Sequence, residues 1–308
     1  MENRTCNFCD GSGRFETSRD VRKIASNVRA FREETFTVWR CPSCRSLHSL
    51  ESADMSKYYR QYPIHGQKED FFTRRLFATR LRQLKRAGME RRHAILDYGC
   101  GNGGFVRFLQ RQGFARSVGY DPYAKEHADD SVLSRRYDFV LCQDVIEHVE
   151  NPDALLDSVM ALVRPGGIAA LGVPDAERLD LGNPYDQAGR LHQPYHRHIP
   201  SAAQLRRRIE SRKWRVVKSI RRWYADTRFP FLNSVFLFRY IRTMEGALDA
   251  AFEPIRFGTI LRSPLLMLAG LFGGFFAPGK DMLILATRVA EEKSKLPSAL
   301  PDLTKHAA

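Results

Sequence analysis

Apolar residues in the middle of the chain fall into two alternating patterns. Short apolar runs, each about as long as a strand, are separated by segments whose apolar residues recur at the spacing of a helix face. The runs are 95–98, 117–120, 137–142 and 168–173. Strands that alternate with helices are typical of an α/β fold with a mostly parallel sheet, so we expect that fold here.

Two of the predicted helices have clear start signals. Asn151 precedes Pro152, and an N-cap residue before a proline at the first helical position predicts a helix from residue 152. Ser201 and Gln204 have the spacing of a capping box, which predicts a second helix over 202–213.

A long apolar insertion separates the last two predicted strands, 214–220 and 281–289. The insertion covers about 225–280, and its run 263–278 has no charged residue but is shorter than the ~20 residues needed to span a bilayer. We expect one of two roles. The insertion is a lid or dimer face buried in protein, or it lies in the membrane interface with its Arg and Lys residues at anionic headgroups.

A glycine-rich turn follows the first predicted strand. Gly99, Gly101 and Gly103 form the turn, and Asp97 lies just before it. Glycine tolerates tight dihedrals and has no Cβ, so the backbone there can approach a ligand. The letters fit the GxGxxG pattern of dinucleotide-binding proteins, with Asp121 placed for a ribose. A carboxylate at Asp97 would repel a pyrophosphate, however, and this favours a positively charged cofactor.

Four motifs resemble those of class I S-adenosyl-L-methionine (SAM) dependent methyltransferases and occur in the same order. They are D-x-G-x-G-x-G at 97–103, Asp121 after the second strand, DVIEHV at 144–149 and RPGG at 164–167. The third is most similar to the O-methyltransferases of ubiquinone biosynthesis and their relatives in sugar pathways. The resemblance implies a SAM-dependent enzyme with a doubly wound, mostly parallel, seven-stranded Rossmann-like sheet in the order 3-2-1-4-5-7-6.

The resemblance also implies which residues bind SAM. Asp121 would accept the ribose hydroxyls, and the residues at the end of the fourth strand would line the pocket. The predicted cofactor site consists of Asp97, Gly99, Gly101, Gly103, Asp121, Gln143 and Asp144. The segment after Asp121 is too short for a helix and a full third strand, so we expect a shortened sheet edge. Asp129 or Asp130 is the candidate for the adenine contact.

Two CxxC pairs predict a metal site near the N-terminus. Cys6 and Cys9 form one pair, and Cys41 and Cys44 form the other. Four thiolates can enclose a tetrahedral zinc ion with no open position for water, so the site would be structural or would dock a partner. Disulfides and a redox CxxC pair are the alternatives. Some sugar C-methyltransferases carry a similar N-terminal zinc module, and the resemblance extends to it.

We expect the chain to divide into a zinc ribbon at 1–50, a methyltransferase domain at 51–290 and a disordered tail at 291–308. The N-terminus has no apolar signal-peptide core, which favours a reducing, cytoplasmic location over disulfide formation. Cys100 and Cys142 are expected to be small buried packing residues.

Histidines are the candidate catalytic groups. Methyl transfer to an oxygen benefits from a base that titrates near neutral pH, and imidazole is the natural choice. His148 is the first candidate, followed by His192 and His196, whose loop faces the acceptor in the family. Glu147 is expected to orient His148 or, as the resemblance to the ubiquinone-pathway enzymes suggests, to help bind a divalent ion. The alternatives are a helix-capping pair at Glu147 and His148 and a metal site in the histidine loop.

The net charge of +14 admits more than one partner. We expect a small-molecule or lipid-linked acceptor, namely a hydroxyl or carbon of a sugar, glycolipid or quinone-like molecule, methylated at the cytoplasmic face of an anionic membrane. An RNA methyltransferase is the alternative, because Lys and Arg also bind phosphates. The sequence QDVIEH at 143–148 differs from the (N/D)PP(Y/F) of enzymes that methylate base amines, which disfavours RNA. A non-catalytic SAM-binding or zinc-docking protein is a second alternative.

Overall fold

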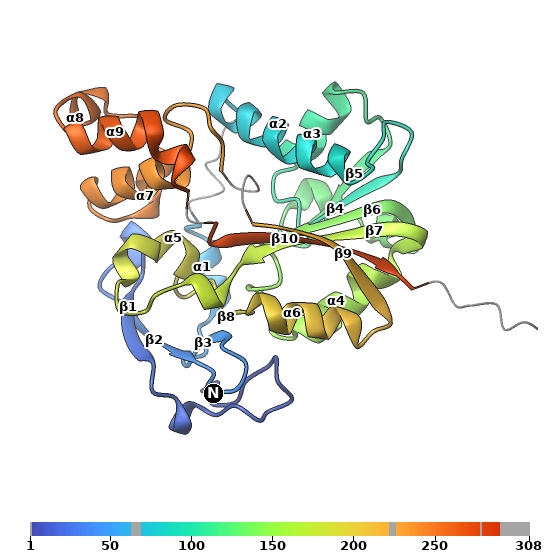
Figure 1. Cartoon of the computed structure of the whole chain (residues 1–308), viewed down its shortest axis with the longest axis horizontal. Coiled ribbons are helices and arrows are strands. Elements are labelled where there is room, and N and C mark those ends of the chain that lie inside the picture. The colour runs from blue at the N-terminus through green and yellow to red at the C-terminus, as the bar shows by residue number, and fades with distance from the viewer. Residues whose placement is uncertain (1, 63–68, 222–225, 278, 290–308) are drawn as a thin grey trace, which may run out of the picture.

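The computed structural model describes residues 2–62, 69–221, 226–277 and 279–289, and a six-stranded sheet lies at its centre (Figure 1). The strands lie in the order β5-β4-β6-β7-β10-β9. The first four run parallel, and β10 is antiparallel to both of its neighbours. The bounds are β4 Ile95–Tyr98, β5 Ser117–Tyr120, β6 Tyr137–Gln143, β7 Val163–Pro174, β9 Trp214–Ile220 and β10 Asp281–Arg288.

The edge of this sheet differs from the prediction by one strand. The α/β class is confirmed, but the seven-stranded order 3-2-1-4-5-7-6 is wrong, because the described residues form no third strand. Two short 3-10 helices, η4 Lys125–His127 and η5 Asp130–Ser134, occupy the connection from β5 to β6 instead. A crossover between parallel strands needs a dozen residues or more, so this segment has no length left for a further strand. The shortened edge is confirmed, and β5 is the edge strand.

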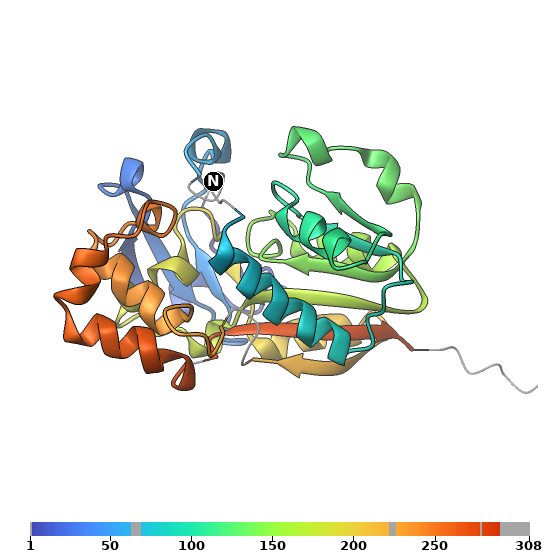
Figure 2. The same ribbon diagram turned by 90° about the horizontal axis from the view of Figure 1, so that it is seen from above.

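Helices cover both faces of the sheet (Figures 1 and 2). α2 Phe71–Arg86 and α3 Gly104–Arg111 lie on one face, and α4 Pro152–Ala161 and α6 Ala202–Glu210 lie on the other. Because both faces are covered, every residue of β6 is buried. The inner strand β6 therefore presents its ends, and not its faces, to solvent, whereas the edge strand β9 has several exposed residues.

A second, smaller sheet joins the N-terminal ribbon to the central part. Its antiparallel strands lie in the order β1-β2-β3-β8, and β8 comes from the segment after β7. Buried Arg40 adds a further link, since its guanidinium donates to the carbonyl oxygens of Ala176 (2.7 Å) and Leu179 (2.6 Å). The bounds are β1 Val21–Ala25, β2 Thr35–Arg40, β3 Leu47–Ser49 and β8 His198–Ile199.

The insertion between β9 and β10 is helical. It contains α7 Ser234–Thr243, α8 Phe257–Leu261 and α9 Pro264–Phe272, with the 3-10 helices η8 Leu248–Ala251 and η9 Gly273–Phe275. These helices share a local core of their own. None of the helices in the described ranges has the length and apolar character needed to cross a membrane.

The remaining helices are short. They are α1 Met55–Tyr59 and α5 Ala188–Leu191, with the 3-10 helices η1 Phe15–Thr17, η2 Arg29–Phe31, η6 Ala176–Arg178 and η7 Pro184–Gln187. The predicted tail at 291–308 lies outside the described residues.

Candidate active site

The glycine-rich turn lies between the end of β4 and the start of α3. Gly99, Gly101 and Gly103 have φ angles of 80°, 54° and 70°, in the left-handed region that favours glycine. A Cβ added at Gly99 would lie 2.3 Å from Cγ2 of Val145, so this glycine is needed for packing. A Cβ added at Gly101 would meet nothing within 4 Å, which leaves open space for a ligand beside the turn.

Two of the predicted acids lie beside this turn. Asp97 is only 6% exposed, and burial raises the pKa of its carboxyl to about 6. A cationic ligand beside Asp97 would favour the ionised form. Asp121 accepts hydrogen bonds from the backbone N–H groups of Gly101 and Tyr123, at 2.9 Å each. Each carboxylate oxygen has a second lone pair, so Asp121 can hold the turn and also accept ribose hydroxyls.

The end of β6 contributes Gln143 and Asp144 to the same region. Gln143 is buried, and neither atom of its amide has a hydrogen-bond partner among the described residues. Leaving a buried amide without partners costs about 1–3 kcal/mol, so Gln143 is a candidate to hydrogen-bond a ligand. Asp144 has a φ of 55°, and the residue is exposed.

His127 is a candidate ligand-contacting residue that sequence reasoning missed. It ends η4, and its Nε2 lies 2.1 Å from the position of a Cβ added at Gly103. That nitrogen is buried without a hydrogen-bond partner in the described part of the chain. No motif marks this position, because it reaches the turn only through the 3-10 helix that replaces the third strand. Asp129 and Asp130, the predicted adenine contacts, instead cap η5 and bind the hydroxyl of Tyr120, respectively.

The three predicted catalytic histidines come together. His148 follows β6, and the loop between β7 and α6 places His192 and His196 beside it. Ring centroids are 4.8 Å apart for His148 and His196 and 5.3 Å apart for His192 and His196. Burial lowers the pKa of all three imidazoles, to about 4 for His196. They are therefore neutral at pH 7 and able to accept a proton.

Hydrogen bonds fix which ring nitrogen carries the proton in two of these histidines. Nδ1 of His192 lies 2.7 Å from Oδ1 of Asn27, and Nδ1 of His196 lies 2.6 Å from the carbonyl oxygen of Arg190. Both partner atoms only accept, so each Nδ1 donates and each Nε2 keeps a lone pair. Nε2 of His192 is buried and has no hydrogen-bond partner among the described atoms. This is the arrangement that a general base requires.

Glu147 is completely buried next to this cluster. Neither of its carboxylate oxygens has a hydrogen-bond partner in the described residues, and burial raises its pKa well above the usual range. One oxygen of Glu147 and one ring nitrogen each of His148 and His196 lie within 4.8 Å of one another. These three residues could hold a divalent ion, which would keep the Glu147 carboxylate ionised. Glu147 makes no capping hydrogen bond that would explain its position.

Tyrosines form one wall of the histidine cluster. The hydroxyl of Tyr59 lies 3.2 Å from Nδ1 of His148, and the ring of Tyr59 stacks on that of Tyr123 with centroids 5.4 Å apart. The ring of Tyr195 stacks on His192 at 4.5 Å. Because Tyr59 belongs to α1 and Tyr123 follows β5, this wall connects the N-terminal segment to the cofactor side of the sheet.

The four N-terminal cysteines form a separate cluster. Their sulfur atoms all lie within 4.8 Å of one another, with 3.5 Å between Cys6 and Cys44 and 3.6 Å between Cys9 and Cys41. Sulfurs around a tetrahedral zinc are about 3.8 Å apart, given a Zn–S distance of about 2.3 Å. Backbone N–H groups of Phe8 and Cys44 point at the sulfurs of Cys6 and Cys41, as expected around thiolates. The described cysteines form no disulfide. Cys142 is buried as predicted, whereas Cys100 is only partly buried, so that part of the prediction is wrong.

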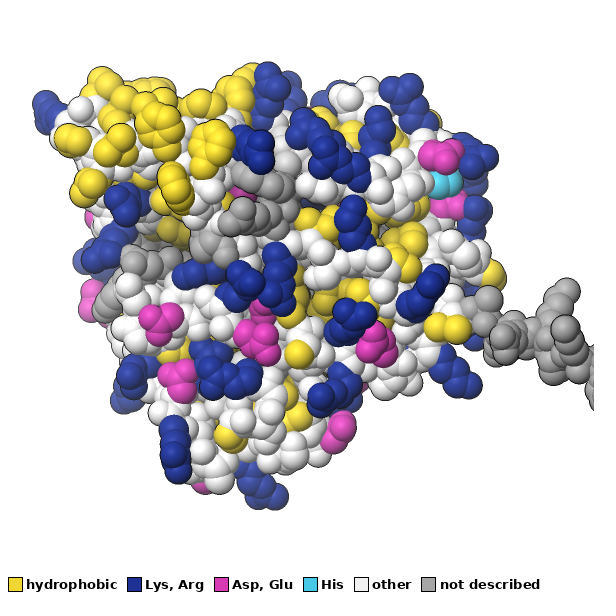
Figure 3. All heavy atoms as spheres, viewed as in Figure 1, with side chains coloured by type: hydrophobic (Ala, Val, Ile, Leu, Met, Phe, Trp, Pro, Cys, Tyr) yellow, Lys and Arg dark blue, Asp and Glu magenta, His cyan; other side chains and the backbone are white. Residues whose placement is uncertain are grey.

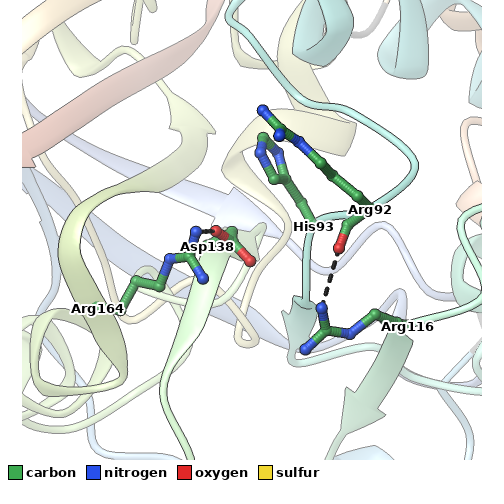
Figure 4. A pocket seen from close by; sticks show the side chains of 5 residues that line it. All are labelled: Arg92, His93, Arg116, Asp138 and Arg164. Carbon is green, nitrogen blue, oxygen red and sulfur yellow. Dashed lines mark hydrogen bonds and ion pairs between the residues drawn. The ribbon is translucent and has the colours of Figure 1, made fainter.

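A cationic pocket of about 280 Å³ lies at the opposite ends of the strands. Figure 4 shows His93 before β4, Asp138 in β6 and three arginines around it. Arg164 pairs with Asp138, and Arg116 donates to the carbonyl oxygen of Arg92 (3.1 Å). The pocket is remote from the glycine turn, which follows the carboxyl end of β4. Its lining residues have partners, since Arg92 pairs with Glu90 and His93 accepts from the backbone N–H of Glu90. We therefore assign it no part in the chemistry.

Comparisons with known proteins indicate a methyltransferase domain. Residues 68–219 match the family described as Methyltransferase domain. The ubiquinone biosynthesis O-methyltransferase of Dinoroseobacter shibae is 32% identical over 135 residues, which cover 37% of this chain and 54% of that protein. The enzyme of the same name from Salmonella newport is 30% identical over 94 residues, covering 24% of this chain and 39% of that protein. The matched region thus spans about half, or less, of each relative.

Solved structures give a weaker likeness. Coclaurine N-methyltransferase bound to N-methylheliamine and SAH has a TM-score of 0.41 and 17% identity, over 69% of this chain and 70% of that one. The four ordered motifs, the glycine turn and the family match over 68–219 are the stronger findings. By these, the domain at 68–219 belongs to the class I SAM-dependent methyltransferases.

Proposed function

We propose that the chain transfers a methyl group from SAM to a hydroxyl, or a carbon, of a sugar, glycolipid or quinone-like acceptor at the cytoplasmic face of a membrane. The observation that carries this proposal is the cluster of neutral, buried imidazoles beside the glycine turn. Val145 connects the two, since it packs against Gly99 and its carbonyl oxygen accepts from the backbone N–H of His148 at 3.0 Å. The relatives are O-methyltransferases of ubiquinone biosynthesis, which supports an oxygen acceptor.

The residues around the turn would hold the cofactor. Asp121 would accept the ribose hydroxyls, Asp97 would face the positive charge, and the unpaired amide of Gln143 would find partners. When bound, SAM supplies an activated methyl group, so the protein mainly has to align the acceptor and remove a proton from its hydroxyl. We assign proton removal to Nε2 of His192, because Asn27 holds the other ring nitrogen protonated.

We also propose that Cys6, Cys9, Cys41 and Cys44 bind one structural zinc ion. The sulfur spacing supports a tetrahedral site, and four protein ligands leave no position for water. Metal analysis of the purified protein tests this directly. A protein that is folded and holds no zinc would refute the assignment.

The function is tested with methyl-labelled SAM, purified protein and a cell extract that is then separated into organic-soluble, RNA and small polar pools. Label in the organic or sugar pool would support the proposal. Label in RNA would overturn it in favour of the RNA methyltransferase. SAM binding without label in any pool would favour a non-catalytic protein.

A matched pair of histidine variants sharpens this test. His192→Gln should lower the rate of labelling about 100-fold or more, because a general base contributes roughly 10²–10⁴. His93→Gln is the control, since His93 stacks on Phe139 at the opposite ends of the strands. Equal rates for the two variants would remove His192 from the mechanism.

A further inference from the structure

The outer side of the insertion exposes many large apolar side chains. Leu261 is 72% exposed and Phe276 is 77% exposed. Figure 3 shows such side chains gathered at the corner of the molecule where Figure 1 places α8 and α9. We call this set the apolar surface. It consists of Phe257, Leu261, Leu265, Leu268, Leu271, Phe272, Phe275 and Phe276.

Helix α9 is apolar on both of its sides. Leu266 packs into the local core of the insertion, whereas Leu265 and Leu268 face outward. A helix that only covers a core carries polar residues on its outer side, as α6 does with Arg206 and Arg207. Contiguous exposed apolar residues of this kind mark an interaction site in a soluble protein.

Arginines border the apolar surface. Arg256 and Arg262 lie at the two ends of α8 and are the only charged residues between positions 254 and 279. Arg239 lies with Leu265 and Phe276 in the wall of a groove of about 570 Å³ within the surface. Long arginine side chains can keep their charge at headgroup level while their stems lie along apolar groups.

The acidic residues of the insertion have partners away from the apolar surface. Asp249 accepts from the backbone N–H of Arg29 in the ribbon, at 2.9 Å. Glu253 and Glu245 both pair with the guanidinium of the same arginine. Asp226 is buried and accepts from the backbone N–H of Ser234, at 2.6 Å. The charge that accompanies the apolar surface is therefore positive.

This combination selects an anionic bilayer over a second copy of the chain. Two copies docked through the apolar surface would bring arginines of the same sign together, which is unfavourable. A bilayer offers hydrocarbon to the leucines and phenylalanines and lipid phosphates to the arginines. No membrane-spanning helix is required, because helices of this kind lie in the interface.

The insertion that carries the apolar surface also contacts the candidate active site through α7, which shares a local core with α9. The guanidinium of Arg190 lies over the ring of Phe238 in α7, 4.6 Å from its centre, and the carbonyl oxygen of Arg190 binds Nδ1 of His196. We infer that the apolar surface docks the protein on the leaflet of an anionic lipid bilayer, so that the histidine cluster meets a membrane-resident acceptor. The inference rests on the proposed function in that the bilayer holds the acceptor; the docking itself needs neither SAM nor turnover.

The test is co-sedimentation of the full chain with vesicles, without SAM. We expect binding to vesicles of phosphatidylcholine with phosphatidylglycerol, and at least tenfold weaker binding to phosphatidylcholine alone. The triple variant Leu265→Gln/Leu268→Gln/Phe276→Ser should bind at least tenfold more weakly than the unchanged protein. Its control is Val217→Ser/Val289→Ser, which removes exposed apolar side chains outside the insertion and should bind normally.

A second pair of variants tests the arginines. Arg256→Gln/Arg262→Gln should weaken binding to the anionic vesicles by about fivefold for each arginine, since a basic residue at such a surface contributes about 1 kcal/mol. Arg135→Gln/Arg136→Gln is the control, because both residues are exposed near the far edge of the sheet. All variants are compared with the unchanged protein by circular dichroism and by calorimetry of SAM binding, which the substitutions should leave unchanged.

Two results would overturn the inference. One is absence of binding to the anionic vesicles by the unchanged protein. The other is a lipid-free dimer that the triple variant converts to a monomer, which would make a second copy the occupant. Vesicle binding in a protein that transfers no methyl group would instead refute the proposed function and leave the docking surface standing.

Discussion

Gly13 allows the four cysteines to come together. A Cβ added at Gly13 would lie 2.1 Å from the sulfur of Cys41. Gly13→Ala should therefore push Cys41 out of the cluster and lower the zinc content well below one ion per chain, as measured by elemental analysis. Gly258→Ala is the control, since nothing lies within 4 Å of its added Cβ. Full zinc content in Gly13→Ala would show that the cluster adapts or that zinc binds elsewhere.

The pH dependence of turnover reports on His192. Burial lowers the pKa of its imidazole well below the usual 6.5, and a general base acts in its unprotonated form. The rate should therefore be lost only as pH falls through this lowered pKa, which places the acid limb of kcat/KM below pH 6.5. The measurement uses the acceptor recovered from the labelled pool. A limb at or above pH 6.5 would point to a base that is not buried, and His93→Gln should leave the profile unchanged.

Residues within a contiguous motif were the easiest to predict. Gly99, Gly101 and Gly103 follow one strand and precede one helix, so their positions depend only on local geometry. His127 and Asn27 could not be found in this way. His127 reaches Gly103 through η4, and Asn27 reaches His192 across 165 sequence positions, so neither contact leaves a local pattern.

At the scale of elements, α6 joins the ribbon through an unexpected contact. Ser201 caps the helix as predicted, accepting from the backbone N–H of Gln204 at 3.2 Å. The side chain of Gln204 does not complete a capping box. It donates instead to the carbonyl oxygen of Phe8, between the first two cysteines, and Arg208 donates to the same oxygen at 2.9 Å.

This contact predicts a moderate effect on stability. Gln204→Ala removes one buried donor, but Arg208 still satisfies the carbonyl oxygen of Phe8. The free energy of unfolding should therefore fall by only about 1 kcal/mol, as measured by urea denaturation. Arg206→Ala, on the exposed side of the same helix, should change it by less than about 0.5 kcal/mol. A loss above about 3 kcal/mol in Gln204→Ala would mean that Arg208 does not compensate.

Strands were predictable where an apolar pattern also had the length of a strand. The strands β6, β9 and β10 appear where the alternation of strands and helices placed them. The missing third strand was signalled by length alone, which shows that a segment is too short but not what replaces it. β8 has two residues and pairs with a strand about 150 positions earlier, so it carries no pattern of its own.

For the whole molecule, we expect the ribbon and the methyltransferase part to unfold together. The β3–β8 pairing and the hydrogen bonds of buried Arg40 join the two parts. Unfolding of the ribbon would therefore also break hydrogen bonds of the methyltransferase part. Removing zinc with a chelator should lower the melting temperature of one calorimetric transition by about 10 °C, since structural zinc contributes several kcal/mol or more. Two separate transitions, of which only the smaller responds to the chelator, would contradict this.

The hydrogen bond from His192 to Asn27 has a consequence for how this protein can be divided. The family match begins at residue 68, whereas Asn27 lies in the ribbon. A fragment that starts at the family boundary keeps the whole glycine turn but loses the residue that sets the tautomer of the candidate base. We expect such a fragment to bind SAM but to transfer the methyl group poorly. The N-terminal segment therefore contributes to the candidate active site, and replacing it would change the surroundings of the candidate base.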